Sequence, residues 1–112
     1  MITTELNDAV ARQVLGWHKV EGWKFWFDAK DQFMVEAKLW NPPKNWAHTG
    51  MVLDRMEELG GLFSCQEDEH GTQVSFEMGV GGRVIGGFYT GTPIQEAICR
   101  AALEAVEKVK EG

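Results

Sequence analysis

The sequence predicts one α+β domain over residues 1–112, in which an antiparallel sheet is flanked by helices as an α-β-α sandwich. Three observations lead to this fold class: apolar residues at helical spacing in three segments, strict alternation over residues 72–78, and turn-forming runs that bound a three-stranded meander. With 44% hydrophobic and 25% charged residues, the composition is that of a globular domain and argues against disorder.

The first predicted element is an amphipathic helix over residues 3–15. Leu6, Val10 and Val14 recur every four residues, which places them on one face of a helix. Gly16 follows and can adopt the left-handed conformation that ends a helix. We therefore expect this helix to pack its apolar face against the domain.

An aromatic segment comes next. All five tryptophans lie within residues 17–46, at Trp17, Trp23, Trp26, Trp40 and Trp46. Aromatics occupy both alternating faces over residues 23–27, and residues 33–40 alternate loosely, so short strands are expected around a turn at residues 28–31. These pieces would give the sheet an additional edge strand. Pro42 and Pro43 end the segment because proline donates no ladder hydrogen bond.

The second half predicts a helix, a meander and a closing helix. Asn45 is a plausible cap for a helix over residues 46–59, which Gly60 and Gly61 would close. Three strands follow at residues 62–66, 72–78 and 83–89, joined by an acidic turn and a glycine cluster at 79–82. Thr92, Pro93 and Gln95 form a helix-start signal for the last helix, whose small-residue face suits close packing on a sheet.

No catalytic, metal or nucleotide motif emerges, and no cofactor is expected. His18, His48 and His70 stand alone in separate segments, without a second ligand at metal-binding spacing. The glycine run at 79–82 is followed by a strand, which favours a hairpin over a phosphate-binding loop. Cys65 and Cys99 are expected to be buried free thiols. These patterns lean away from an enzyme.

The charge pattern disfavours nucleic acid as a partner. Acidic residues outnumber basic ones by 17 to 11, which gives a formal charge of −6, and the lysines are strung singly instead of forming a basic stripe. No stretch reaches membrane-spanning length, and the N-terminus lacks the basic lead and apolar core of a signal peptide. A cytoplasmic location is the resulting expectation, with no membrane partner.

The tryptophans indicate a protein-binding surface. Tryptophan is enriched at interface hot spots, and five within thirty residues exceed what a small core usually needs. Trp17 and Trp46 flank helices and are expected to fill the core. The candidate partner-binding residues are Trp23, Trp26 and Trp40.

Three segments carry a resemblance to a known family. They are residues 14–17 (VLGW), residues 45–47 (NWA) and residues 92–103 (TPIQEAICRAAL). Together they make the chain similar to the phage α-β-α sandwich domain family of small phage and prophage proteins. The resemblance implies a sheet flanked by helices and a phage-derived genome context. It implies no established activity, and it carries no catalytic residues to transfer.

Three functional hypotheses follow. The first is a non-enzymatic phage accessory protein that binds a host or phage protein, or a second copy of itself as a homodimer, through exposed aromatics and the acidic surface. The second is a small-ligand-binding or sequestering protein, or an enzyme, with a pocket between the aromatic segment and the glycine-interrupted last strand, lined by His18 or His48 with Arg83. The third is DNA mimicry, which requires the carboxylates of Glu57, Glu58, Glu67, Asp68 and Glu69 to gather on one face.

Overall fold

The computed structural model describes residues 3–69, 71–80, 83–90 and 93–111. Its elements in chain order are the helix α1 (Thr3–Ala9), the π-helix η1 (Val10–Val14), the strands β1 (His18–Lys19), β2 (Phe25–Phe27) and β3 (Phe33–Glu36), the 3₁₀ helix η2 (Ala37–Leu39), the helix α2 (Trp46–Glu58), the strands β4 (Gly61–Asp68), β5 (Gly71–Val80) and β6 (Arg83–Thr90), and the helix α3 (Ile94–Glu111).

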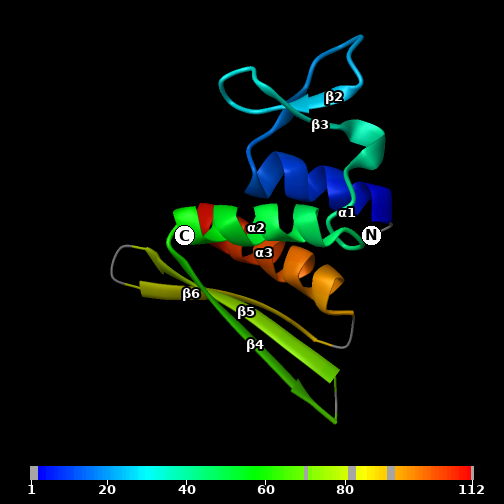
Figure 1. The fold of residues 1–112 in the computed structure, drawn as a ribbon. Coiled ribbons are helices and arrows are strands. Elements are labelled where there is room, and N and C mark those ends of the chain that lie inside the picture. The colour runs from blue at the N-terminus through cyan, green and yellow to red at the C-terminus, as the bar shows by residue number, and fades with distance from the viewer. Residues whose placement is uncertain (1–2, 70, 81–82, 91–92, 112) are drawn as a thin grey trace.

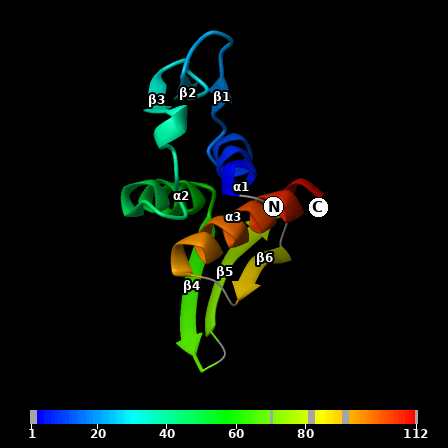
Figure 2. The same cartoon turned by 90° about the vertical axis from the view of Figure 1, so that its right-hand side faces the viewer.

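The strands form two antiparallel three-stranded sheets with the helices between them (Figures 1 and 2). We call β1-β2-β3 the aromatic sheet and β4-β5-β6 the meander sheet. The α+β class and the meander are confirmed. The aromatic segment, however, does not add an edge strand to the meander, because it pairs only with itself on the far side of the helices.

The meander sheet has an unbroken register in both of its hairpins. Gly61 pairs with Met78 at one end of β4 and Asp68 with Gly71 at the other, so β4 takes in part of the expected acidic turn. Val80 pairs with Arg83 across the expected glycine turn, of which residues 81 and 82 lie outside the described residues. The predicted strands are confirmed.

Helix α3 covers one face of the meander sheet. Its small buried residues, Ala97, Ala101 and Ala105, allow close approach to the inward residues of β5, which are Thr72, Val74, Phe76 and Met78. Burying a side chain the size of valine or phenylalanine contributes about 1.5–3 kcal/mol. On the opposite face Gln73 and Ser75 are half-buried and Glu77 is exposed.

The N-terminal helix packs on α3 and lies away from the meander sheet, contrary to the expectation of a single sheet flanked by helices. Its last turn widens into the π-helix η1, where the Leu15 amide donates to the Val10 carbonyl at 3.2 Å. The wider turn lets Val10, Ala11 and Val14 all be buried. Gly16, at a φ of +72°, ends the helix as predicted.

Helix α2 begins and ends as the sequence predicts. The Asn45 side-chain oxygen accepts hydrogen bonds from the amides of Ala47 at 2.9 Å and His48 at 3.3 Å. Gly60, at a φ of +85°, follows the helix. The proposed cap of α3 at Thr92 lies outside the described residues, and the Gln95 side-chain amide donates to the Thr49 hydroxyl at 3.2 Å, which joins α3 to α2. None of the helices in the described ranges is long and apolar enough to cross a membrane.

Candidate functional site

The aromatic sheet separates its side chains onto two faces. In the central strand β2, Trp26 points toward the helices, and Phe25 and Phe27 point outward. Trp26 pairs with Lys19 and Val35, and Phe27 pairs with His18. A register shift after Trp26 brings Phe33, instead of Met34, opposite Phe27. The outward face therefore gains one more aromatic ring.

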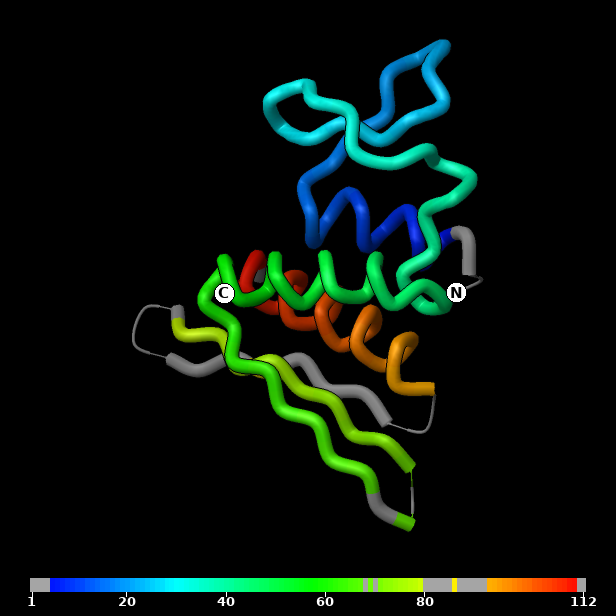
Figure 3. Tube along the Cα trace, viewed as in Figure 1, coloured from blue at the N-terminus to red at the C-terminus, as the bar shows by residue number. Residues whose placement is uncertain are grey.

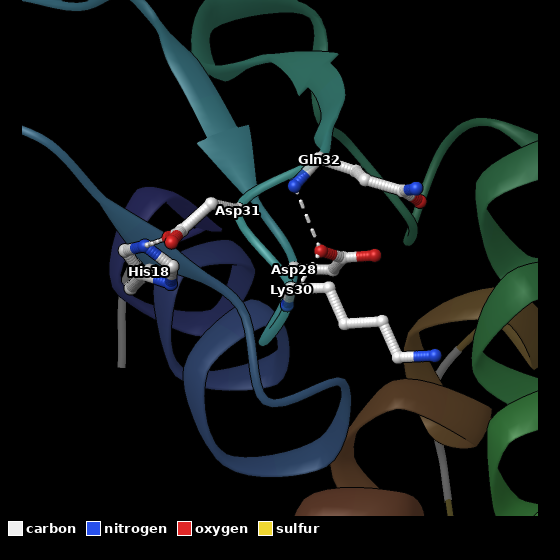
Figure 4. A network of polar contacts seen from close by, with 5 residues as sticks. All are labelled: His18, Asp28, Lys30, Asp31 and Gln32. Carbon is white, nitrogen blue, oxygen red and sulfur yellow. Dashed lines mark hydrogen bonds and ion pairs between the residues drawn. The ribbon is translucent and has the colours of Figure 1, made fainter.

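The turn between β2 and β3 is fixed by its own polar groups, as Figure 4 shows. The Asp28 carboxylate accepts hydrogen bonds from the amides of Lys30 and Gln32, each at 2.9 Å. Asp31 takes a φ of +61°, and its carboxylate lies 3.1 Å from Nε2 of His18 in β1. The predicted turn is confirmed, and it links all three strands of the aromatic sheet.

Four rings gather on the outward face, and we call Trp23, Phe25, Phe27 and Phe33 the outer aromatic cluster. Trp23 meets Phe27 edge to face with centroids 6.1 Å apart, and Phe25 lies 5.4 Å from Phe33. The four rings alone line a hollow of about 140 Å³. Trp23 is 62% and Phe33 68% exposed, so the cluster presents a large apolar surface to solvent.

Trp26 belongs to the opposite face and is fully buried, so the expectation that it is exposed for a partner is wrong. The Arg12 guanidinium carbon lies 5.2 Å and the Lys19 ammonium nitrogen 4.6 Å from its ring centroid. Both cations are attracted to the face of the indole ring. Trp26 thus attaches the aromatic sheet to η1.

Trp40 is only 2% exposed, so it too is a structural residue and not an exposed partner contact. Its ring centroid lies 4.7 Å from that of Trp17 and 4.8 Å from that of His48. Trp17 precedes β1, Trp40 follows β3 and η2, and His48 lies in α2. The three rings therefore connect both ends of the aromatic sheet to α2. Trp17 fills the core as expected.

Trp46 departs from its expected core position, because it is 60% exposed. It is the first residue of α2, and the buried face of that helix is formed instead by His48, Thr49, Val52 and Met56. Sequence reasoning also did not single out the three phenylalanines of the outer aromatic cluster. The signal for two of them was present, since positions 23, 25 and 27 alternate with the buried Trp26.

The two titratable groups with shifted pKa values, His48 and Cys99, both lie in the packed interior. The amide of Asn41 donates to Nδ1 of His48 at 3.0 Å, and desolvation lowers the pKa of that histidine. Burial and the nearby Glu96 raise the pKa of Cys99 to about 12, which suits an inert thiol. Cys65 is exposed, contrary to expectation. Among the described residues, no group of three or more histidine, cysteine or carboxylate side chains could hold a metal ion.

The pocket expected between the aromatic segment and the last strand does not form, because the helices separate the aromatic sheet from β6 (Figure 1). The side chain of Arg83 lies outside the described residues. The acidic grouping that DNA mimicry would require is divided. Glu57 and Glu58 end α2, whereas Glu67 lies near the far end of β4, about 20 Å from Gly61 at the rise per residue of a strand. Figure 3 shows β4 running away from the end of α2.

Comparisons with known proteins agree with this architecture. The model of the phage ABA sandwich domain family matches residues 8–103, so the chain belongs to that family. A phage protein from Bacillus cereus ATCC 14579, solved as a crystal structure at 2.0 Å, is similar in fold with a TM-score of 0.58 and 18% sequence identity. The similarity covers 96% of this chain and 89% of that one. Among curated proteins, none matches the sequence.

Proposed function

We propose that this phage-family protein is a non-enzymatic accessory protein that binds a host or phage protein in the host cytoplasm through the outer aromatic cluster. The observation that carries the proposal is the exposure of Trp23 and Phe33 beside a hollow lined only by aromatic rings. An exposed apolar patch of this kind on a small protein typically marks an interaction site. Tryptophan anchors dominate the energy of many interfaces.

The support beneath the cluster suits a binding surface. The Asp28 turn and the His18–Asp31 contact fix the strands that hold the rings. The cations on Trp26 and the Trp40 contacts fix the sheet to the helices. A surface organised before binding loses less conformational entropy when a partner docks. The partner would therefore meet rings that are already in place.

The chain offers a matched control for testing this proposal. Trp46 is 60% exposed, close to the 62% of Trp23, but it lies at the start of α2 and outside the cluster. Tagged wild-type protein, a Trp23→Ser and Phe33→Ser double variant, and a Trp46→Ser variant would each be expressed in cells carrying the phage. Captured proteins would then be quantified by mass spectrometry.

We expect the double variant to lose a partner that the wild type and Trp46→Ser both retain. Circular dichroism of the purified variants would verify that each one is folded. Identical capture by all three proteins would contradict the proposal, as would loss of the partner in Trp46→Ser alone.

Binding of a small amphipathic anion is a second candidate, favoured by one hollow of about 280 Å³. Apolar side chains and two cationic residues line it, together with Gln13 and Gly16: Val14, Leu59, Met78, Val106, Val109, Arg55 and Lys110. An apolar hollow with a few charged groups is typical of ligand sites. Titration with decanoic acid, followed by calorimetry, tests this candidate, and an absence of heat at soluble concentrations would contradict it.

A further inference from the structure

Strand β4 presents a long, regular edge. Within the described part of the chain only β5 pairs with it, through eight consecutive residue pairs without a bulge. Natural edge strands are usually protected by lysine, proline or a bulge, because their free backbone groups can pair with another chain. Residues 61–68 contain neither lysine nor proline. The edge of β4 is therefore open to a further strand.

Apolar side chains flank this edge on both faces of the sheet. Leu62 is 69% and Phe63 45% exposed. Phe63 pairs with the buried Phe76 on the face that carries the helices, and Leu62 pairs with Glu77 on the other face. A hollow of about 340 Å³ opens between α2 and β4, lined by Leu53, Asp54, Glu57, Gly61, Leu62, Phe63 and Phe76. An added strand could place one apolar side chain in this hollow.

The charge around the hollow determines which strand fits. Both charged residues that line it, Asp54 and Glu57, are acidic and exposed. Outside the hollow, Glu77 stands across from Leu62 and Glu67 lies near the end of the strand. A strand with basic residues beside its apolar ones would neutralise these carboxylates.

A second copy of this chain fits the edge poorly. Antiparallel pairing of β4 with β4 about a twofold axis would bring the Glu67 end of one copy beside the Gly61 end of the other. Gly61 lies against α2, close to Asp54 and Glu57, so carboxylates would meet carboxylates. Each copy also carries a formal charge of −6. Like charges brought together at an interface oppose association.

We propose that the edge of β4 binds an extended segment of another protein by strand addition, and that the face of this segment that meets the hollow carries an apolar residue with basic residues two positions to either side. Backbone hydrogen bonds along β4 supply the pairing, and the hollow beside Phe63 together with the carboxylates supplies the selectivity. This surface lies on the opposite side of the helices from the outer aromatic cluster, so it is independent of the function proposed above (Figure 2).

The test uses short synthetic peptides with the full-length protein. One peptide carries lysine, valine and lysine at every second position with threonine between them, so that all three share one face. A second has glutamate in place of lysine, and a third carries proline at the centre of the valine and lysine sequence. Fluorescence anisotropy measures the affinity of each peptide. Alkylation of the exposed Cys65, which lies on the same face of β4 as Phe63, reports whether the edge is occupied.

A matched pair of variants separates local charge from total charge. The first double variant is Asp54→Asn with Glu57→Gln, beside the hollow. The second is Glu21→Gln with Glu107→Gln, away from it. Both remove two negative charges from exposed positions. We expect the first pair of substitutions to weaken binding of the valine and lysine peptide at least about threefold, and the second pair to change it little. Bound peptide should also slow alkylation of Cys65. Trp23→Ser should leave peptide affinity unchanged.

Several outcomes would overturn the proposal. They are equal affinity for the lysine and glutamate peptides, full affinity of the proline peptide, equal weakening by both pairs of substitutions, and an unchanged alkylation rate with bound peptide. Sedimentation as a dimer that Phe63→Ser dissociates would replace it with self-pairing. Loss of peptide binding in Trp23→Ser would show that the peptide occupies the outer aromatic cluster instead.

Discussion

The indole N–H of Trp40 donates to the backbone carbonyl of Asn7 at 2.9 Å, and the side-chain amide of Asn7 donates to the backbone carbonyl of Trp40 at 3.2 Å. This reciprocal pair joins α1 to the chain that leaves the aromatic sheet. Tilted ring contacts of Trp40 with Trp17 and His48 extend the junction to α2. Trp40 thereby fixes the position of the sheet that carries the outer aromatic cluster.

Replacing Trp40 should therefore lower the free energy of unfolding more than replacing Trp26. Trp40→Phe leaves the partly buried carbonyl of Asn7 without its indole donor, whereas Trp26→Phe removes a buried N–H that has no acceptor among the described residues. We expect Trp40→Phe to lower the free energy of unfolding by about 1 kcal/mol more than Trp26→Phe. Urea denaturation measures the difference. An equal or larger loss in Trp26→Phe would refute the structural role given to the Trp40 indole.

The two thiols should react at different rates. Cys65 is exposed, and Cys99 is buried with its pKa raised to about 12, so little reactive thiolate forms there near neutral pH. Iodoacetamide should modify Cys65 in the native protein and Cys99 only after unfolding. Peptide mapping by mass spectrometry distinguishes the two sites. Comparable labelling of both thiols in the native protein would show that Cys99 is accessible.

His48 should make stability depend on pH. Burial lowers its pKa below 6.5 in the folded state, so the unfolded chain binds the proton more readily. Its contribution to stability is complete above pH 6.5 and is lost as the pH falls from there toward the folded-state pKa. Urea unfolding of the wild type and His48→Gln, above and below pH 6.5, should show a smaller pH dependence in the variant. Parallel profiles for the two proteins would contradict this role of His48.

Gly61 should tolerate no side chain. A Cβ at this position would lie 2.8 Å from the Met78 sulfur and 3.0 Å from the Met56 carbonyl oxygen, where α2 meets β4. We expect Gly61→Ala to lower the free energy of unfolding by about 1–3 kcal/mol through overpacking. Gly79→Ala is the control, since a Cβ there meets nothing within 4 Å. Equal stability of the two variants, measured by thermal unfolding, would disprove the close contact.

The sequence predicted the elements well where one local signal decides them. The alternation of residues 72–78 anticipates β5, and the Asn45 cap anticipates the start of α2. Whether a given apolar residue is buried depends on how the elements pack together, which no local sequence signal determines. Cys65 faces inward on β4 and is nevertheless exposed, and Trp46 begins α2 outside its buried face.

The residues of the candidate site were predicted only in part, because their exposure also depends on how the elements pack together. A run of aromatics indicates either core or interface, and only the packing of the sheet on the helices separates the exposed Trp23 from the buried Trp26 and Trp40. The shift that brings Phe33 opposite Phe27 is a feature of strand pairing, and no local residue pattern marks it.

The most direct measurement is the affinity for the captured partner, once purified, determined by isothermal titration calorimetry. The comparison is between the wild type, the Trp23→Ser and Phe33→Ser double variant, and Trp46→Ser. We predict that the double variant weakens binding by about thirtyfold or more, as expected for a hot spot worth about 2 kcal/mol, and that Trp46→Ser binds like the wild type. Unchanged affinity in a folded double variant would contradict the assignment of the outer aromatic cluster as the partner surface.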